Sequence, residues 1–191
     1  MVVNKMTEII ENQNHVEKFT LPEGVSIKVH EGIITVSGPK GEVSKSFLHP
    51  LVQIKIHGNV VEFETERYMK QQKKLLNTFL SHLKNICTGV LKGHEYKLKI
   101  CSGHFPMNVS LKGNTLEVKN FIGEAVPRRV QIKEGTTAKL EGDIITVSGI
   151  NKDLTSQMAA TIEKMTRRNG FDKRIFQDGI YIIQKDGKKL E

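Results

Sequence analysis

Two stretches of sequence that repeat one pattern decide the fold: KIHGNVVEF at residues 55–63 and KLEGDIITV at residues 139–147. In each stretch, apolar residues alternate with polar ones on both sides of a short turn, Gly-Asn in the first and Gly-Asp in the second. Alternation with period two predicts antiparallel strands with one buried face. Glycine beside Asn or Asp supplies the positive φ that a tight turn requires, so each stretch predicts a β-hairpin.

The two predicted hairpins belong to an internal duplication. They lie 84 positions apart (139 − 55), and the same offset relates VSIK at residues 25–28 to VSLK at residues 109–112. A second identity, IITVSG at residues 33–38 and 144–149, has an offset of 111 (144 − 33) and would break the order of the other matches. We interpret it as the same kind of strand in a different hairpin.

The first copy continues into a helical pattern. Apolar residues recur at three- and four-residue steps and predict an amphipathic helix over roughly residues 66–91. Thr65 is the predicted N-cap, and Gly89 or Gly93 the predicted stop. Cys87 lies on the apolar stripe, which indicates a small core residue rather than a reactive thiol.

The second copy also ends in a predicted helix, over about residues 152–169. Asn151 or Asp153 is the predicted cap, and Gly170 the predicted stop. A single amphipathic helix that follows a few antiparallel strands can bury its stripe only against their sheet. The predicted fold is therefore α+β, with two tandem duplicated domains, each an antiparallel sheet packed against one amphipathic helix.

The duplication divides the chain into three predicted parts. These are an N-terminal arm over residues 1–19, a first repeat domain over 20–92 and a second over 93–191. No apolar run approaches the roughly 20 residues of a membrane-spanning helix, and the charged start of the chain does not resemble a secretory signal. We therefore expect no membrane partner.

Composition narrows the function class. The chain has 29 Lys and Arg against 21 Asp and Glu, a net charge of +8, which indicates a polyanionic partner. Its two cysteines are too few for a disulfide framework or a four-cysteine zinc site. Aromatic residues make up only 6% of the chain and Trp is absent, which argues against a surface built on base stacking.

The sequence offers no recognisable catalytic machinery. It contains no phosphate-binding glycine loop, and the C-x-x-H spacing of residues 101–104 lacks a second pair of metal ligands. GPKG at residues 38–41 matches the loop with which KH domains clamp RNA, but it follows a strand instead of joining two helices. We interpret it as a plain turn, with Lys40 as a secondary RNA contact. We expect no enzyme activity, cofactor, metal or small-molecule substrate.

Basic residues concentrate in RRNGFDKR at residues 167–174, with Arg128-Arg129 as a smaller pair. The first two arginines have an alternative explanation, because cations at a helix C-terminus complement its dipole by about 0.3–1 kcal/mol each. That explanation does not extend to Lys173 and Arg174, which lie in the next loop. Arginine forks in a glycine-containing loop can approach phosphates closely, so this segment predicts RNA contact.

Several spaced motifs resemble one protein family. It is the family of universal protein six of the large ribosomal subunit, numbered nine in eukaryotic naming, in its archaeal and eukaryotic branch. The motifs occur in the family's order and cover the chain from about residue 21 to 185. They are TVSGPKG at 35–41, GHEYKLK at 93–99, HFPMN at 104–108, NFIGE with RRV at 120–130, and DKRIFQDGIY at 172–181.

The resemblance implies two duplicated α+β domains and a structural role in translation. It implies that the second domain binds large-subunit rRNA near the docking region of translational GTPases, beside neighbouring ribosomal proteins, in the cytoplasm, with nucleolar assembly in a eukaryote. The alternative is an RNA-binding or protein-interaction module outside the ribosome. The rRNA-binding candidates are Lys92, His94, Tyr96, Lys97, Lys99, Arg128, Arg129, Arg167, Arg168, Lys173, Arg174 and Tyr181.

Overall fold

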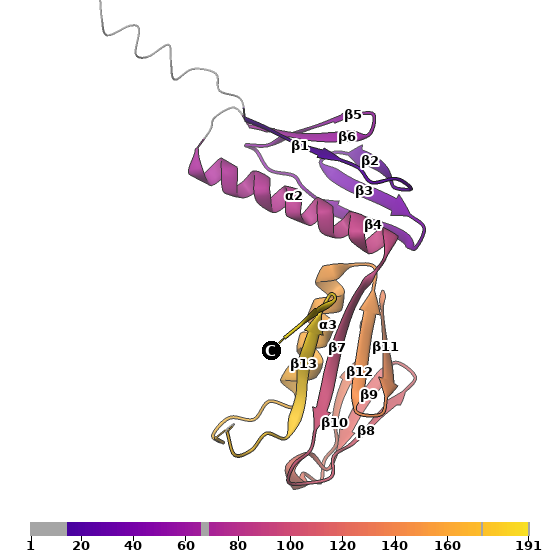
Figure 1. Cartoon of the computed structure of the whole chain (residues 1–191), viewed down its shortest axis with the longest axis vertical. Helices are drawn as coiled ribbons and strands as arrows, with labels where there is room; N and C mark the ends of the chain where they lie inside the picture. The colour runs from indigo at the N-terminus through magenta and orange to yellow at the C-terminus, as the bar shows by residue number, and fades with distance from the viewer. Residues whose placement is uncertain (1–14, 66–68, 173, 191) are drawn as a thin grey trace, which may run out of the picture. The chain divides into compact units, whose positions relative to one another are not determined.

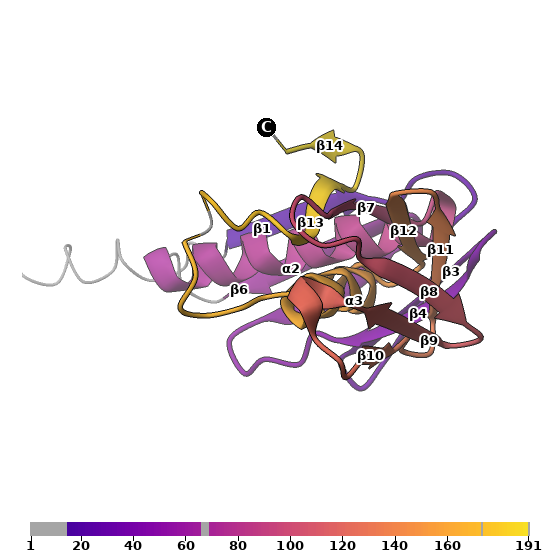
Figure 2. The ribbon, with the colours of Figure 1, turned by 90° about the horizontal axis from the view of Figure 1, so that it is seen from below.

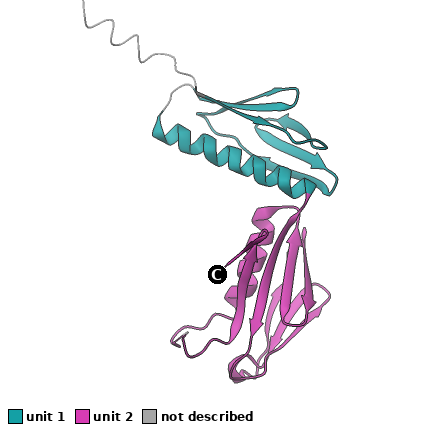
Figure 3. Cartoon of the chain, viewed as in Figure 1, with its two compact units in different colours: residues 1–91 teal, residues 92–191 magenta. Residues whose placement is uncertain are grey.

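The computed structural model describes residues 15–65, 69–172 and 174–190. The chain divides into two compact units, Met1–Leu91 and Lys92–Glu191 (Figure 3). Their junction lies one residue before the predicted domain boundary. Residues 1–14 of the predicted N-terminal arm lie outside the described residues. The predicted end of the arm at residue 19 needs correction, because His15–Thr20 already forms strand β1 of unit 1. This strand pairs with β6, Val60–Thr65.

The described residues of unit 1 form two three-stranded antiparallel sheets and one helix (Figure 1). The first sheet has the order β1-β6-β5, where β5 is Gln53–His57. The second has the order β2-β3-β4, with bounds Ser26–His30, Ile33–Gly38 and Gly41–Ser46. Helix α2, Lys70–Leu91, contacts β1 and β6 of the first sheet and β3 and β4 of the second. One apolar helix stripe therefore covers both sheets.

Unit 2 repeats this arrangement with a larger first sheet. Five antiparallel strands have the order β11-β12-β7-β13-β14, with bounds Thr136–Glu141, Ile144–Gly149, His94–Cys101, Gly179–Lys185 and Lys188–Lys189. The smaller sheet has the order β10-β9-β8, with bounds Arg128–Gln131, Thr115–Lys119 and Asn108–Lys112. A 3₁₀ turn, η1, spans Phe121–Gly123. Helix α3, Lys152–Met165, contacts β7, β12 and β13 on one side and β10 on the other (Figure 2).

The topology confirms the predicted duplication. The hairpins β5–β6 and β11–β12 contain the two stretches that are 84 residues apart, and both turn glycines, Gly58 and Gly142, have positive φ. The IITVSG strands are β3 and β12, which lie in different hairpins yet share the same burial pattern along their length. The α+β fold is thus confirmed, with one refinement: each unit divides its strands between two sheets.

The predicted ends of the first helix need correction. Thr65 is the last residue of β6 and is buried, so it does not cap the helix; the predicted helix residues 66–68 lie outside the described part. Gly89 lies inside α2, buried against the core, and Gly93 follows the helix with a φ of 80°. Of the two predicted stops, Gly93 is the one at the helix end.

The second helix begins as predicted and ends earlier than predicted. Asn151 caps it, since its side chain accepts a hydrogen bond of 2.9 Å from the backbone N–H of Asp153. The helix ends at Met165 rather than near residue 169. The cause is Thr166, whose hydroxyl oxygen accepts a 2.9 Å hydrogen bond from the backbone N–H of Ile180 in β13. Gly170 lies in the loop beyond.

Each unit has its own apolar core. In unit 1 the core is built on Ile34, Val36, Val61, Phe63 and Leu83, all fully buried. In unit 2, Leu98, Leu116, Val147, Met158 and Ile162 come from both sheets and α3. Burial of each such side chain contributes about 1.5–3 kcal/mol. No helix among the described residues is long and apolar enough to cross a membrane.

Candidate nucleic-acid interface

The basic segment, residues 167–174, lies in the loop that leads from α3 to β13 (Figure 1). Arg167, Arg168 and Arg174 are all exposed, and the Arg174 side chain is 90% exposed. Lys173 lies outside the described residues. Within the described part of the chain, neither Arg167 nor Arg168 forms an ion pair with a carboxylate. The segment therefore presents positive charge that the protein does not neutralise internally.

Asp172 is the one acid of this segment, and it pairs with Arg174. The Nη2 of Arg174 lies 2.8 Å from Oδ2 of Asp172, and the Arg174 backbone N–H donates to Oδ1 at 2.9 Å. The hydrogen bond from the Arg174 side chain holds the pKa of Asp172 below its usual value. This contact orients the guanidinium but leaves it accessible to an anion.

Ring contacts hold the loop in place. The guanidinium carbon of Arg168 lies 4.1 Å above the ring centre of Phe171, a cation–π contact. Phe171 meets Phe176 edge to face at 5.1 Å, and Phe176 lies 5.1 Å from the ring of His104. These contacts link the basic segment to the loop after β7. The loop that carries the arginines is therefore already ordered before any partner binds.

A buried carboxylate anchors the same region. Asp178 accepts hydrogen bonds from the backbone N–H groups of Gly103 at 2.6 Å and His104 at 3.0 Å, and its Oδ2 lies 2.7 Å from Nδ1 of His104. Burial opposes its ionisation, but the hydrogen bonds from His104 and Gly103 prevail and lower the pKa of Asp178. The described residues contain no group of three potential metal ligands. His104, the histidine of the C-x-x-H motif, thus forms a hydrogen bond with Asp178.

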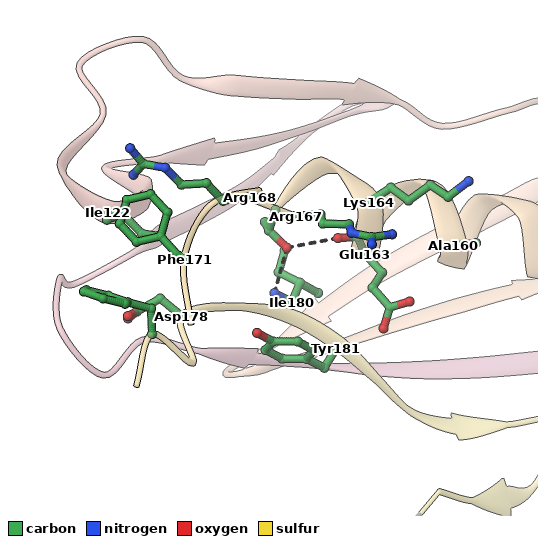
Figure 4. A pocket seen from close by; sticks show the side chains of 12 residues that line it. Ile122, Ala160, Glu163, Lys164, Arg167, Arg168, Phe171, Asp178, Ile180 and Tyr181 are labelled. Atoms are coloured by element: carbon green, nitrogen blue, oxygen red, sulfur yellow. Dashed lines mark hydrogen bonds between the residues drawn. The ribbon is translucent and has the colours of Figure 1, made fainter. Parts of the chain in front are cut away.

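A pocket of about 330 Å³ opens between the end of α3, the basic segment and β13 (Figure 4). Its lining combines apolar, aromatic and cationic side chains. The apolar and aromatic ones are Ile122, Ala160, Phe171, Phe176, Ile180 and Tyr181. The cationic ones are Lys164, Arg167 and Arg168, and the polar ones Glu163, Thr166 and Asp178.

Two hydrogen-bond connections fix the walls of this pocket. Thr166 donates to the carbonyl of Glu163 at 3.2 Å and accepts from the backbone N–H of Ile180 (Figure 4). One carboxylate oxygen of Glu163, Oε1, accepts from the backbone N–H of Ile182 at 3.0 Å. Because both contacts join α3 to β13, the pocket is part of the folded unit rather than a gap between mobile segments.

Arg128 is engaged within unit 2. Its Nε and Nη2 donate to the two oxygens of Glu124 at 2.8 and 2.6 Å, and this hydrogen bond lowers the pKa of Glu124. Its Nη1 donates to the carbonyl of Met165, the last residue of α3, at 2.5 Å. The guanidinium also lies 4.4 Å over the ring of Phe121. These contacts favour a structural role for Arg128.

Arg129 belongs to a different cationic cluster, which lies on the smaller sheet. It pairs with Glu117 at 2.9 Å through Nε, and Lys112 and Lys119 approach the same carboxylate at 3.6 and 3.7 Å. The hydrogen bond from Arg129 lowers the pKa of Glu117. Since one buried acid faces three cations, this cluster keeps an excess of positive charge. Arg129 itself is 65% exposed.

Comparisons with known proteins identify the family of the chain. A sequence model of the family described as Ribosomal protein L6 matches residues 21–93 and 105–179. The chain belongs to this family. Its relatives named large ribosomal subunit protein uL6 include one from Methanosarcina mazei, 46% identical over 86% of this chain and 94% of its own length. Another, from Saccharolobus solfataricus, is 41% identical over 89% and 94%. These relatives place the chain in the archaeal branch of the L6 family.

Two candidates carried over from the resemblance are wrong as surface contacts. His94 is 1% exposed and Tyr96 5% exposed, both inside unit 2. The pleat of β7 explains this, because alternate residues point to opposite faces and the face of His94 and Tyr96 lies in the core. His94 Nδ1 lies 3.0 Å from Asp186. The period-two pattern of β7 thus divides the residues of the GHEYKLK motif between two faces.

The remaining candidates of the motif lie on the other side of β7. Lys99 is exposed and Lys97 is half-buried, with its amine 3.3 Å from Glu95. Lys92 is exposed just before the strand. Tyr181 is 38% exposed and joins Arg167 and Arg168 at the pocket. The structure thus gathers Arg167, Arg168 and Tyr181 at one place, and leaves Arg129 and the β7 lysines outside the pocket.

Lys40 belongs to unit 1. The turn GPKG joins β3 to β4, and the Lys40 backbone N–H donates to the carbonyl of Val90 in α2 at 3.0 Å. The interpretation of this motif as a plain turn is confirmed. Lys40 is exposed, and its contact with RNA stays a prediction.

Sequence reasoning missed the aromatic side of the pocket. Phe171 and Phe176 lie within the basic segment and its continuation, and both line the pocket. The signal was available: two phenylalanines five residues apart in a polar loop have no strand or helix stripe to join. Their position in the loop indicates local packing or ligand contact.

Proposed function

We propose that this chain is a structural component of the large ribosomal subunit and that unit 2 binds large-subunit rRNA. The observation that carries the proposal is the exposed basic segment at the end of α3, in a chain of the L6 family. The printed names of its archaeal relatives support the ribosomal role. We include in the proposal a position near the docking region of translational GTPases and contact with neighbouring ribosomal proteins.

The binding mechanism is electrostatic and geometric. Arg167 and Arg168 offer forked guanidinium donors to phosphate oxygens, and Arg174 adds an exposed guanidinium that Asp172 orients. Neutralised phosphates release condensed counterions. A-form RNA hides its base edges in a deep major groove, so recognition relies on backbone shape and on unpaired nucleotides. The fixed connection between α3, the loop and β13 supplies the shape. The proposal contains no chemical step.

The salt dependence of rRNA binding tests the proposal. Each phosphate contact contributes about 0.7–0.9 to the slope of log K against log salt. Arg167→Ala with Arg174→Ala should weaken binding of full-length large-subunit rRNA and reduce this slope by about 1.5. The control is Lys28→Ala with Lys139→Ala, which removes the same charge from exposed positions outside the segment. An unchanged slope in the arginine variant, measured by filter binding, contradicts the assignment.

Cosedimentation separates a subunit component from a free module. Large subunits are washed with high salt and run through a sucrose gradient. A structural component stays in the large-subunit peak, whereas an extra-ribosomal RNA-binding protein appears at the top of the gradient. The second result would overturn the ribosomal role.

A further inference from the structure

We infer that the pocket at the end of α3 receives one unpaired nucleobase of the RNA that the basic segment binds. This inference rests on the proposed function and deepens it, because it assigns a specific contact within the rRNA interface. The occupant is a base with an exocyclic amino group: adenine, guanine or cytosine. The rest of the interface then holds the backbone on either side of that base.

The size of the pocket fits a single ring system. Its volume of about 330 Å³ lies at the low end of the 300–1,000 Å³ typical of small-ligand sites. A helical segment of RNA is far too large to enter. A base that is extruded from its stack can enter, and unpaired bases are the part of folded RNA that proteins contact most specifically.

Aromatic rings line the pocket, and contacts within unit 2 hold them in place. Phe171 and Tyr181 are each 38% exposed although both line the pocket, so their rings remain partly uncovered. Phe171 is held by Arg168 on its face and by Phe176 on its edge. The Tyr181 ring lies against Gly179, where an added Cβ would be only 3.3 Å from the ring atoms. Such rings are stacking platforms for bases at little entropic cost.

Of the chain's eleven aromatic residues, eight Phe and three Tyr, three line this one pocket. The low aromatic content of the sequence therefore does not exclude stacking. What matters for a single base is how the rings are gathered, and the fold gathers them from the loop and from β13.

Glu163 gives the pocket a hydrogen-bond acceptor. Its Oε1 accepts from the backbone N–H of Ile182, which fixes the carboxylate, while Oε2 accepts no hydrogen bond from the described residues. Asp178, the other carboxylate of the lining, already receives its donors from Gly103 and His104. Oε2 of Glu163 is thus the acceptor left for an amino group of a base, which uracil lacks.

Positive charge around the pocket selects RNA over an apolar protein side chain. Lys164, Arg167 and Arg168 line it, and none forms an ion pair with a described carboxylate. The RNA backbone that runs past the pocket carries phosphates, which these cations can neutralise whether or not the base is inserted. An inserted leucine or phenylalanine of a partner protein carries no negative charge and would not neutralise these three cations.

Filling the pocket tests the inference. Ala160 lines it from α3 and is half-buried, so Ala160→Phe occupies the space without removing a cation or a hydrogen bond. We expect binding of full-length large-subunit rRNA to weaken about tenfold, with an unchanged salt slope because no phosphate contact is lost. The matched control is Gln157→Phe, an exposed position of the same helix, which should bind like the unmodified protein.

A second variant guards against misfolding of the first. Tyr181→Leu keeps an apolar side chain but removes the stacking face, and it should also weaken binding about tenfold at constant slope. Thermal unfolding followed by circular dichroism verifies that both variants are folded.

The outcomes separate the inference from the proposed function. If Ala160→Phe and Tyr181→Leu are folded and bind rRNA as tightly as the unmodified protein, the inference of a base in the pocket is wrong. This holds even where the double arginine variant lowers the salt slope and so supports rRNA binding. Weaker binding with a lower slope also overturns it, because the loss then belongs to phosphate contacts. Glu163→Gln refines the test: the inference expects a similar loss of affinity, and unchanged affinity excludes the amino-group contact.

Discussion

Arg128 shows how a residue engaged in contacts within its own unit can prepare a binding surface. The C-terminus of a helix carries roughly half a negative charge on its unsatisfied carbonyls, which repels phosphates. Arg128 donates to the carbonyl of Met165 at 2.5 Å and reaches that of Arg167 at 3.5 Å. Its own charge is balanced by Glu124. Because Arg128 satisfies these carbonyls, the helix end beside the exposed arginines repels phosphates less.

Asp178 is the residue whose ionisation ties two loops together. Its pKa is lowered, since burial opposes ionisation less than the hydrogen bonds of His104 and Gly103 favour it. A carboxyl with a depressed folded-state pKa contributes stability above its unfolded value, here 3.8, and the contribution is lost as pH falls through the folded-state pKa. The connection between the loops should weaken only in acid.

Asp178→Asn tests this pH dependence. We expect it to lower the free energy of unfolding by about 2 kcal/mol at pH 7, because hydrogen bonds to a charged group are replaced by weaker ones. The difference from the unmodified protein should begin to shrink as pH falls below 3.8, the unfolded-state pKa, and should disappear once the carboxyl is also protonated in the folded state. Urea unfolding at pH 7 and pH 3 measures both values. A difference that stays the same at both pH values contradicts the assignment.

At the scale of elements, the two IITVSG strands show why the same six residues recur. Both strands bury their second isoleucine and the valine, and both end in a glycine that touches a helix. A Cβ on Gly38 would lie 2.9 Å from Val90 of α2. A Cβ on Gly149 would lie 2.5 Å from the hydroxyl of Thr155 in α3. The strand motif therefore includes the close approach of strand end and helix.

Gly149→Ala should destabilise unit 2 for this steric reason. The added methyl would meet Thr155 at 2.5 Å and the backbone oxygen of Gly135 at 2.9 Å, and the backbone atom cannot move without shifting the turn that leads into β11. We expect a loss of about 1–3 kcal/mol in the free energy of unfolding. Gly103→Ala is the control, because nothing lies within 4 Å of its added Cβ. Equal stability of the two variants in urea would show that the strand end has room.

The elements also show what the sequence could and could not predict. The hairpins were predictable because their turns depend on local residues, as at Gly58 and Gly142, and the start of α3 because Asn151 acts two residues away. The end of α3 was not predictable, because the Thr166 hydroxyl accepts a hydrogen bond from the backbone N–H of Ile180, fourteen residues further along the chain. The basic segment was visible as charge, whereas its pocket depends on tertiary contacts that no local pattern encodes.

At the scale of the whole molecule, duplication has produced two units with separate cores and different additions. Unit 1 ends with α2, whereas unit 2 continues past α3 into the basic segment, β13 and β14. β13 pairs with β7 in the centre of the larger sheet, so the segment between α3 and β13 is anchored at both ends. The addition that distinguishes the second copy is thus the one that forms the pocket.

Separate cores predict that damage to one unit leaves the other intact. Leu83 of α2 and Ile162 of α3 are both fully buried, so alanine at either position should cost about 2–5 kcal/mol. Hydrogen exchange followed by mass spectrometry should show faster exchange in peptides of unit 1 alone for Leu83→Ala, and of unit 2 alone for Ile162→Ala. Because the basic segment and pocket belong to unit 2, only Ile162→Ala should weaken rRNA binding. Loss of protection in both units from either substitution would mean that the two cores unfold as one.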